Sequence, residues 1–238
     1  MLQVENLKKK YYLGDKKDGT VIFYSWLRQY VKKEFVVLNI GAGQTADRRV
    51  RSLKGEVNQV IGVDISNEVL ENKDLDRALV IEKDKIPFPN NYFDLCFSDF
   101  VMEHIDDPRA FLKEVYRVLK PGSSFFFRTP NKHHYVSFIG RMTPFWFHRL
   151  VANRVRGLPQ DAHEPHPTFY RFNTKNDINK YSFECCFKNI ELRFIEAEPS
   201  YLVFHPIPFI LGVVYERLVN KYSFCSGIRA NILGRLEK

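Results

Sequence analysis

The sequence predicts an α/β fold in which helices cover a mostly parallel sheet. Short apolar runs bounded by turn residues recur at residues 35–40, 60–63, 78–81, 93–97 and 124–128. Runs of this length and composition are typical of strands that are buried on both faces. Segments with apolar residues at helical spacing separate several of these runs, and such alternation is typical of βαβ units.

Length and composition support one globular domain with additions. The chain has 238 residues, 45% of them hydrophobic, and only 12 Gly and 12 Pro, which excludes a disordered or collagen-like chain. Four cysteines, two of them adjacent, form no disulfide framework, and residues 1–12 lack the apolar stretch of a signal peptide. We therefore expect a reduced, cytoplasmic protein.

The first predicted element is a helix. Residues 18–34 begin with Asp18 and then place apolar residues three and four positions apart, which is the pattern of an amphipathic helix before the first strand. We therefore expect an N-terminal helical cap over residues 1–34 and the main domain over residues 35–238.

A capped helix and a long insertion come later in the chain. Asp107 and Pro108 predict a helix start, because a capping acid precedes proline at the first helical position. Residues 130–173 are irregular and dense in His, Arg, Pro and aromatic residues, and an insertion of this length in an α/β chain predicts a substrate lid. A helix near residues 175–187 and a strand near residues 190–194 resume the alternation.

Residues 199–215 form the longest uncharged segment, with 17 residues that include three prolines. The segment is too short and too interrupted for a membrane-spanning helix, which needs about 20 apolar residues. Packing in the core, contact with a membrane surface and a wall for an oily substrate all stay open.

A glycine-rich turn follows the first predicted strand. Gly41, Ala42, Gly43 and Gln44 form this turn, and Asp64 ends the second strand-like run, 21 residues after Gly43. In an open parallel sheet, ligands bind beyond the carboxyl ends of the strands, where glycines allow the backbone to come close. An acid in the position of Asp64 can accept hydrogen bonds from a ribose diol. The arrangement predicts a site for an adenosine-containing ligand.

A nicotinamide site is an alternative interpretation of this turn. The turn also fits the dinucleotide fingerprint G-x-G-x-x-[GA], with Ala46 in the third position. Tyr116 and Lys120 have the spacing of the Tyr-x-x-x-Lys pair of short-chain reductases, so an NAD(P)-dependent reductase stays open. We favour it less, because Tyr116 lies on a predicted helix that ends before Pro121, where an amphipathic pattern explains the spacing.

Six segments in order favour one family. They are NIGAG, VDIS, IPFPNNYFD, MEHIDDP, EVYRVLKPG and RTPN, and they cover about residues 35–131. In this order they resemble the class I S-adenosylmethionine-dependent methyltransferases of type 11, the branch that contains ubiquinone- and menaquinone-biosynthesis methyltransferases. The resemblance implies a Rossmann-like three-layer sandwich with a mostly parallel seven-stranded sheet, and S-adenosylmethionine as the cofactor.

For the turn, the resemblance implies that residues 41–44 cradle the methionine half of the cofactor, Asp64 binds the ribose hydroxyls and Ile65 lies against the adenine. Two positions depart from the family pattern: Asn39 stands where the first motif usually has an acid, and Thr45 replaces the third glycine. Because Asn39 can still hydrogen-bond and Thr45 can cap the following helix, we expect a working site with altered contacts. A cofactor-binding protein without turnover is the alternative that these departures leave open.

The resemblance also implies contacts farther along the chain. Glu82 takes the position of the adenine-amine contact, with the backbone of Lys83 beside it, and Asp84 is the alternative if the register slips by two residues. Ser98 and Asp99, at the end of the fourth strand, lie where the family places backbone contacts to the methionine moiety.

Three histidines are candidate catalytic bases. Methyl transfer is an in-line displacement in which the protein mainly aligns the acceptor and excludes water. A hydroxyl acceptor must lose a proton, which a neutral histidine can take. His104, just past the fourth strand, is the first candidate, and His133 and His134, after the fifth strand, are further candidates.

The insertion and the charge indicate the kind of acceptor. His163, Glu164 and His166 are cation-ligand types, but prolines interrupt the helix that would space them, so we expect no metal. The net charge of +8 favours a small anionic or lipid-like acceptor, or a peripheral membrane contact. We expect methyl transfer to a small molecule, an oxygen of a natural product, glycan or lipid-like compound. The chain has no base-methyltransferase motif and no RNA-binding module, so we expect no nucleic-acid partner; the oligomeric state stays open.

Overall fold

The computed structural model describes residues 2–12, 18–45, 49–83, 85–137 and 167–238. The chain divides into two compact units. Unit 1 comprises Met1–Ile22, Pro130–Pro167 and Phe194–Asn231, and unit 2 comprises Phe23–Thr129, Thr168–Arg193 and Ile232–Lys238. Residues 138–166, most of the predicted lid, lie outside the described residues.

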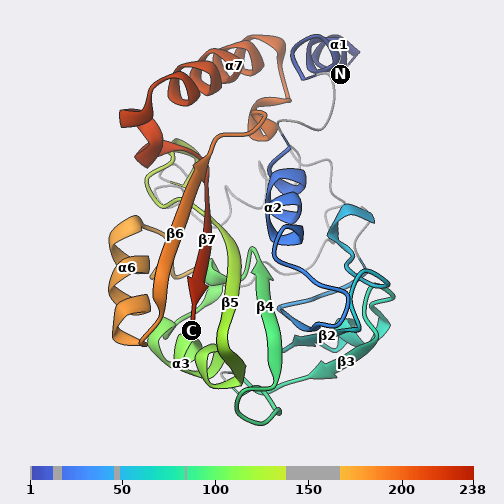
Figure 1. The fold of residues 1–238 in the computed structure, drawn as a ribbon. Coiled ribbons are helices and arrows are strands. Elements are labelled where there is room, and N and C mark those ends of the chain that lie inside the picture. The colour runs from blue at the N-terminus through green and yellow to red at the C-terminus, as the bar shows by residue number, and fades with distance from the viewer. Residues whose placement is uncertain (1, 13–17, 46–48, 84, 138–166) are drawn as a thin grey trace. The chain divides into compact units, whose positions relative to one another are not determined.

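A seven-stranded sheet organises the fold, with the strand order β3-β2-β1-β4-β5-β7-β6 (Figure 1). The strands are β1 (Val36–Ile40), β2 (Gln59–Asp64), β3 (Arg77–Val80), β4 (Phe93–Asp99), β5 (Leu119–Pro130), β6 (Lys188–Ile195) and β7 (Asn231–Glu237). Strands β1 to β5 pair in parallel. Strand β7 runs antiparallel to β5, because Asn131 N–H bonds Ala230 O at one end and Lys238 N–H bonds Ser123 O at the other. The predicted mostly parallel seven-stranded sheet is confirmed.

The described residues form five α-helices, and two of them begin directly after an acidic capping residue. They are α1 (Leu2–Tyr11), α2 (Gly19–Arg28), α3 (Pro108–Val118), α6 (Lys175–Glu184) and α7 (Pro206–Lys221). The Asp18 carboxylate accepts from the Thr20 amide at 2.7 Å, and Asp107 accepts from the Arg109 amide at 3.0 Å. These bonds satisfy amides that the first helical turn leaves without a partner.

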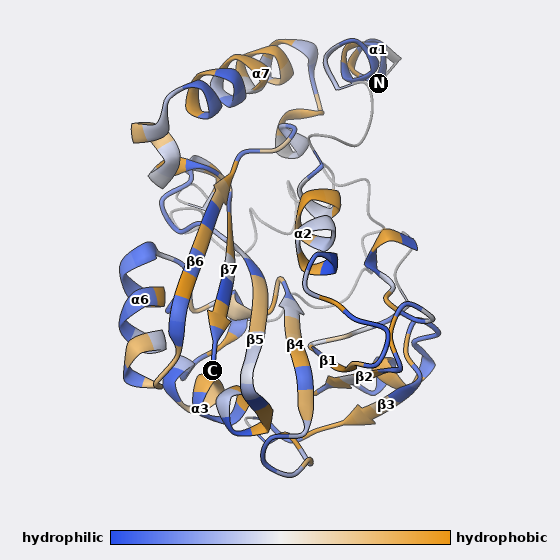
Figure 2. Cartoon of the chain, viewed as in Figure 1, coloured by the Kyte–Doolittle hydropathy of each residue, from blue (hydrophilic) through white to orange (hydrophobic). Residues whose placement is uncertain are grey.

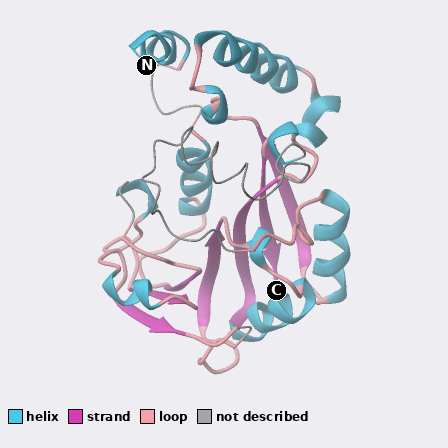
Figure 3. Ribbon diagram, turned by 180° about the vertical axis from the view of Figure 1, so that it is seen from behind, coloured by secondary structure: helices cyan, strands magenta, loops and turns pink. Residues whose placement is uncertain are grey.

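Helices cover both faces of the sheet in unit 2 (Figures 1 and 3). Successive side chains of a strand point to opposite faces, and β5 shows this with two fully buried phenylalanines. Phe125 contacts Phe111 of α3, with ring centroids 6.1 Å apart, whereas Phe126 contacts Trp26 of α2, at 5.1 Å. The core therefore lies between α3 and one face and between α2 and the other.

The segment after the glycine turn differs from the prediction. In place of the expected helix, the described residues between β1 and β2 contain only a short 3-10 helix, Arg49–Arg51. The hydroxyl of Thr45, expected to cap that helix, donates to Glu71 O at 3.3 Å and accepts from Lys73 N–H at 2.8 Å. These bonds tie the turn to the segment that precedes β3. A cap at Thr45 would accept from the amides of residues 47 and 48, which lie outside the described residues, so the capping role stays a prediction.

In unit 1, α1 and α7 pack side by side. Val4 of α1 and Phe209 and Val213 of α7 form a buried apolar cluster. Within the described parts of the chain, no helix is long and apolar enough to cross a membrane.

Candidate functional site

The candidate site lies at the carboxyl ends of β1, β2 and β4, in unit 2. Ile40 pairs with Val63 on one side and with Ser98 on the other, so the three strands end at the same edge of the sheet. The amide of Gly41 then bonds Val63 O at 2.8 Å. The Asp64 carboxylate accepts from the Gly43 amide at 2.9 Å and from the Ser66 amide at 2.9 Å. These bonds fix the carboxylate at the strand ends and leave it lone pairs for further donors.

The two glycines of the turn differ in the space that surrounds them. Gly41 and Gly43 both have positive φ, +71° and +51°, a backbone region that suits glycine. A Cβ at Gly41 would collide with the side chain of Val101, whereas none of the described residues lies within 4 Å of the position that a Cβ would take at Gly43. The backbone at Gly43 is therefore open to a ligand, and with Asp64 nearby it fits the adenosine end of a nucleoside cofactor.

Asn72 holds the turn in place. Its side-chain amide donates to the carbonyls of Ala42, Gly43 and Gln44, at 3.1, 3.0 and 3.1 Å. Asn72 is buried although it follows a short 3-10 helix, Asn67–Glu71. Sequence reasoning missed this residue, because an asparagine before Lys and Asp reads as an ordinary turn residue.

A buried ion pair lies at the ends of β4 and β5. Arg128 is 2% exposed and bonds Asp99 through two nitrogens, at 2.6 and 2.7 Å. Its guanidinium carbon also lies 4.4 Å from the ring centre of Phe100. Burial, together with the Asp99 carboxylate, raises the pKa of Tyr24. The side chain of Asp99 is thus committed to Arg128, and its backbone is the part left for the predicted cofactor contact.

Glu103 is a buried carboxyl beside this edge that sequence reasoning passed over in favour of His104. Thr129 Oγ1 donates to Glu103 Oε2 at 3.1 Å and accepts from Asn173 Nδ2 at 2.6 Å, and all three side chains are buried. Burial raises the pKa of Glu103 to about 7, and the Asp99 charge adds to the increase. The carboxyl therefore changes its charge near neutral pH.

The loop after β4 anchors the C-terminal end of the insertion. The carbonyl of Glu103 accepts from the amides of Phe169 and Tyr170, at 2.8 and 3.3 Å. Arg171 pairs with Asp106, with 2.8 Å between Nη1 and Oδ1. The C-terminal end of the predicted lid is therefore fastened beside the candidate site.

The other predicted cofactor residues lie at the same edge with varied exposure. Asn39 is half-buried between Gly62 and Phe97 in the sheet. Glu82 is 83% exposed and pairs with Lys85 at 3.4 Å, and Ile65 is also exposed. Lys83 Nζ lies 3.9 Å from Asp106 Oδ2, and Gln44 is exposed. The buried hydroxyl of Ser98 has no hydrogen-bond partner in the part of the chain that the structure describes. Asp84 lies outside the described residues.

The three candidate bases do not fall in one unit. His104 ends the 3-10 helix Met102–His104 of unit 2, with its amide bonded to Val101 O at 2.9 Å. His133 and His134 belong to unit 1. His133 is exposed, whereas His134 is buried with Nε2 3.4 Å from Glu196 Oε1.

Tyr116 and Lys120 lie away from the candidate site. Lys120 Nζ bonds Asp94 Oδ1 at 2.6 Å, next to the first residue of β4, and the Tyr116 ring packs against Phe187. Both residues are therefore near the amino end of β4, opposite the edge where a cofactor would bind. This geometry argues against the reductase interpretation.

The strand order and the glycine turn bonded to an acid after β2 together define a domain of the class I S-adenosylmethionine-dependent methyltransferase type. Residues 38–127 match the family described as a methyltransferase domain, and this part of the chain is similar to ubiquinone- and menaquinone-biosynthesis methyltransferases of that class.

The curated relatives cover part of the chain. It is 33% identical over 135 residues to the demethylmenaquinone methyltransferase of Staphylococcus saprophyticus, which covers 50% of this chain and 56% of that protein. It is 35% identical over 102 residues to the ubiquinone/menaquinone biosynthesis C-methyltransferase UbiE of Burkholderia vietnamiensis, covering 39% and 42%. The chain thus spans about half the length of these relatives.

The likeness to a solved structure extends over the whole chain. A SAM-dependent methyltransferase from Archaeoglobus fulgidus superposes with a TM-score of 0.56 at 18% identity, covering 98% of this chain and 99% of that one. At this identity the likeness shows the fold, and it agrees with the predicted Rossmann-like architecture.

Proposed function

We propose that the protein transfers a methyl group from S-adenosylmethionine to a small-molecule acceptor. The observation that carries the proposal is the turn at Gly43, whose amide bonds Asp64 and whose outer side has no neighbour within 4 Å among the described residues. Asp64 would accept the ribose hydroxyls with its remaining lone pairs, and the exposed Ile65 would lie against the adenine. Glu82 and the backbone of Asp99 would supply the adenine-amine and methionine contacts.

The bound cofactor would supply an electrophilic methyl group, so the chain mainly has to align the acceptor and exclude water. For a hydroxyl acceptor, we propose that His104 takes the proton as the oxygen attacks. This role is supported by the position of His104 just after β4, in unit 2 with the cofactor residues. His133 and His134 are the weaker candidates, since the buried His134 lies against Glu196.

The proposed acceptor is a small lipid-like, glycan or natural-product molecule that is methylated on oxygen. The names of the relatives support a small-molecule acceptor, because one is called a demethylmenaquinone methyltransferase and the other a ubiquinone/menaquinone biosynthesis C-methyltransferase. The net charge of +8 supports an acceptor with anionic groups.

Calorimetry tests cofactor binding. S-adenosylmethionine and S-adenosylhomocysteine should bind, and Asp64→Ala should weaken both by about 100-fold, because the turn and the ribose lose a charged acceptor. Glu34→Ala, which removes an exposed carboxylate before the amino end of β1, at the opposite end of that strand from the turn, is the control and should bind as the wild type does. Binding of NAD alone would favour the reductase, and binding of none of these ligands would contradict the proposal.

Transfer of label from methyl-labelled S-adenosylmethionine tests turnover on a panel of phenols, hydroxylated glycans and prenylated hydroquinones. Labelled product is the expected result. His104→Gln should lower kcat by about 100-fold or more on a hydroxyl acceptor with little change in KM. Turnover within a few-fold of the wild type would exclude His104 as the base. Cofactor binding without transfer to any member of the panel would support the non-catalytic alternative.

A further inference from the structure

Helix α7 of unit 1 presents an apolar face to solvent. Its exposed side carries Ile207 (64% exposed), Ile210 (40%), Leu211 (64%), Val214 (50%) and Leu218 (50%). At about 100° per residue these five side chains share one side of the helix. Three exposed aromatic residues, Phe204, Tyr222 and Phe224, lie in the segments that flank the helix. Figure 2 shows the hydrophobic colouring along α7.

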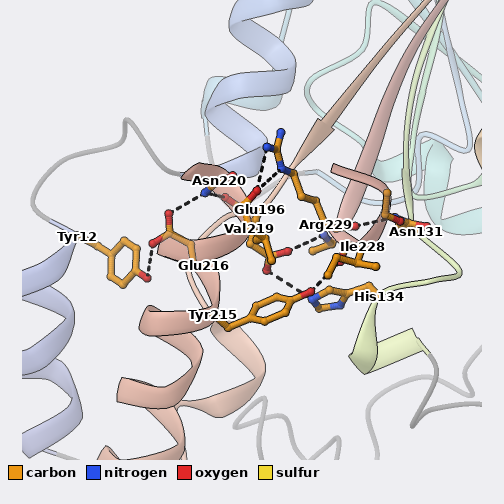
Figure 4. A network of polar contacts seen from close by, with 12 residues as sticks. Tyr12, Asn131, His134, Glu196, Tyr215, Glu216, Val219, Asn220, Ile228 and Arg229 are labelled. Atoms are coloured by element: carbon orange, nitrogen blue, oxygen red, sulfur yellow. Dashed lines mark hydrogen bonds and ion pairs between the residues drawn. The ribbon is translucent and has the colours of Figure 1, made fainter. Parts of the chain in front are cut away.

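Hydrogen bonds and apolar packing hold the opposite side of α7 (Figure 4). Glu216, 1% exposed, accepts from Tyr12 Oη at 3.3 Å and from Asn220 Nδ2 at 2.8 Å. Asn220 Nδ2 also donates to Glu196 O at 3.1 Å, and Tyr215 Oη donates to Ile228 O at 2.8 Å. These bonds, with the apolar cluster around Phe209, hold this side of α7 inward. The outward orientation of the aliphatic side chains is therefore set by the packing of unit 1.

A helix that is apolar on its solvent side needs an external apolar partner. With 16 residues, α7 is too short to span a bilayer, which takes about 20. It has the length and the pattern of a helix that lies in the plane of a membrane surface, with aromatic residues at its ends.

The charge of unit 1 selects the kind of surface. Unit 1 contains 13 Lys or Arg and 8 Asp or Glu, so it carries +5 of the net charge of +8. The last turn of α1, beside α7, holds Lys8, Lys9 and Lys10, and α7 ends at the exposed Lys221. The single acid of α7 is the buried Glu216. Basic groups around an apolar stripe match anionic lipid headgroups, whereas a symmetric dimer would set this charge against itself.

We propose that the apolar face of α7 docks the protein on an anionic membrane surface. The five aliphatic side chains enter the boundary between headgroups and acyl chains, and the lysines of α1 and α7 contact the headgroups. The proposal does not depend on methyl transfer, because it concerns a surface formed within unit 1.

Flotation with lipid vesicles tests the proposal. The wild-type chain should float with phosphatidylcholine vesicles that contain about 30% phosphatidylglycerol, and binding should weaken in about 1 M salt, where charges are screened beyond about 3 Å. Binding to pure phosphatidylcholine should be weaker by about tenfold or more. The triple variant Ile207→Gln, Leu211→Gln, Leu218→Gln should lose at least about tenfold in partitioning to the anionic vesicles.

The matched control is Phe183→Gln, which removes an 80% exposed apolar side chain from α6 of unit 2 and should float like the wild type. Circular dichroism and thermal unfolding of each variant check that the fold is kept. Absence of wild-type binding at low salt, or equal binding by a folded triple variant, would overturn the proposal. A wild-type dimer that the triple variant abolishes, without lipid binding, would assign the face to a second copy instead.

Discussion

The buried carboxyl of Glu103 makes the stability of this fold depend on pH. Its pKa is raised from 4.5 to about 7, mainly by burial. A carboxyl with a raised pKa binds more protons in the folded state than in the unfolded chain. Its contribution to stability is therefore present in full below about pH 4.5 and is lost as the pH rises through about 7. At 1.36 kcal/mol per pKa unit, the shift corresponds to about 3 kcal/mol of unfolding free energy.

Glu103→Gln removes this titration while keeping an oxygen that can accept from Thr129. From about pH 5.5 to pH 8, linkage lowers the unfolding free energy of the wild type by about 2 kcal/mol. The variant should not show this decrease. Urea unfolding at a series of pH values, followed by circular dichroism, measures how the unfolding free energy of the wild type and of the variant changes with pH. Glu34→Gln, which changes an exposed carboxyl, is the control and should keep the wild-type slope. Parallel profiles for the wild type and Glu103→Gln would refute the reasoning.

Three further predictions concern the candidate site and the sheet beneath it. Asn72→Asp should weaken S-adenosylhomocysteine binding by about tenfold or more in calorimetry, because a carboxylate would face three carbonyl oxygens; unchanged affinity would contradict this. Arg128→Met should lower the unfolding free energy by about 3–5 kcal/mol, since it leaves the charge of Asp99 buried, and adding Asp99→Asn should restore part of it. Gly62→Ala should cost about 1–3 kcal/mol because its Cβ would overlap Leu75, and a Leu75→Ala background should relieve the loss in thermal unfolding.

Local pattern was enough to predict most of the architecture. Apolar runs located the strands, because a strand buried on both faces needs apolar side chains throughout. Capping acids located the starts of α2 and α3, since the bond from Asp107 to the amide of Arg109 lies within three residues of chain. The sequence also predicted that the turn and Asp64 lie close together, because neighbouring parallel strands have their carboxyl ends at the same edge of the sheet. The family match over residues 38–127 rests on the same segments.

Other features depend on residues far apart in the sequence. Asn72 contacts a turn 28 to 30 residues earlier, and Arg128 pairs with Asp99 across two strands. Among the described residues after the glycine turn there is a short 3-10 segment and not the expected helix, and Thr45 bonds a different part of the chain. No local spacing encodes these partners, so the residues predicted at the site were mainly those that lie next to a strand end.

The sequence by itself determined the class of fold, the location of the glycine turn and the family that its motifs resemble. The tertiary structure decided which polar groups are buried and which apolar groups are exposed. The raised pKa of Glu103 depends on burial by segments that include Thr129 and Asn173. The exposed apolar face of α7 depends on the hydrogen bond from Tyr12 to Glu216 on the opposite side of the helix. Burial and desolvation are sums over neighbours in space, and those neighbours come from distant parts of the chain.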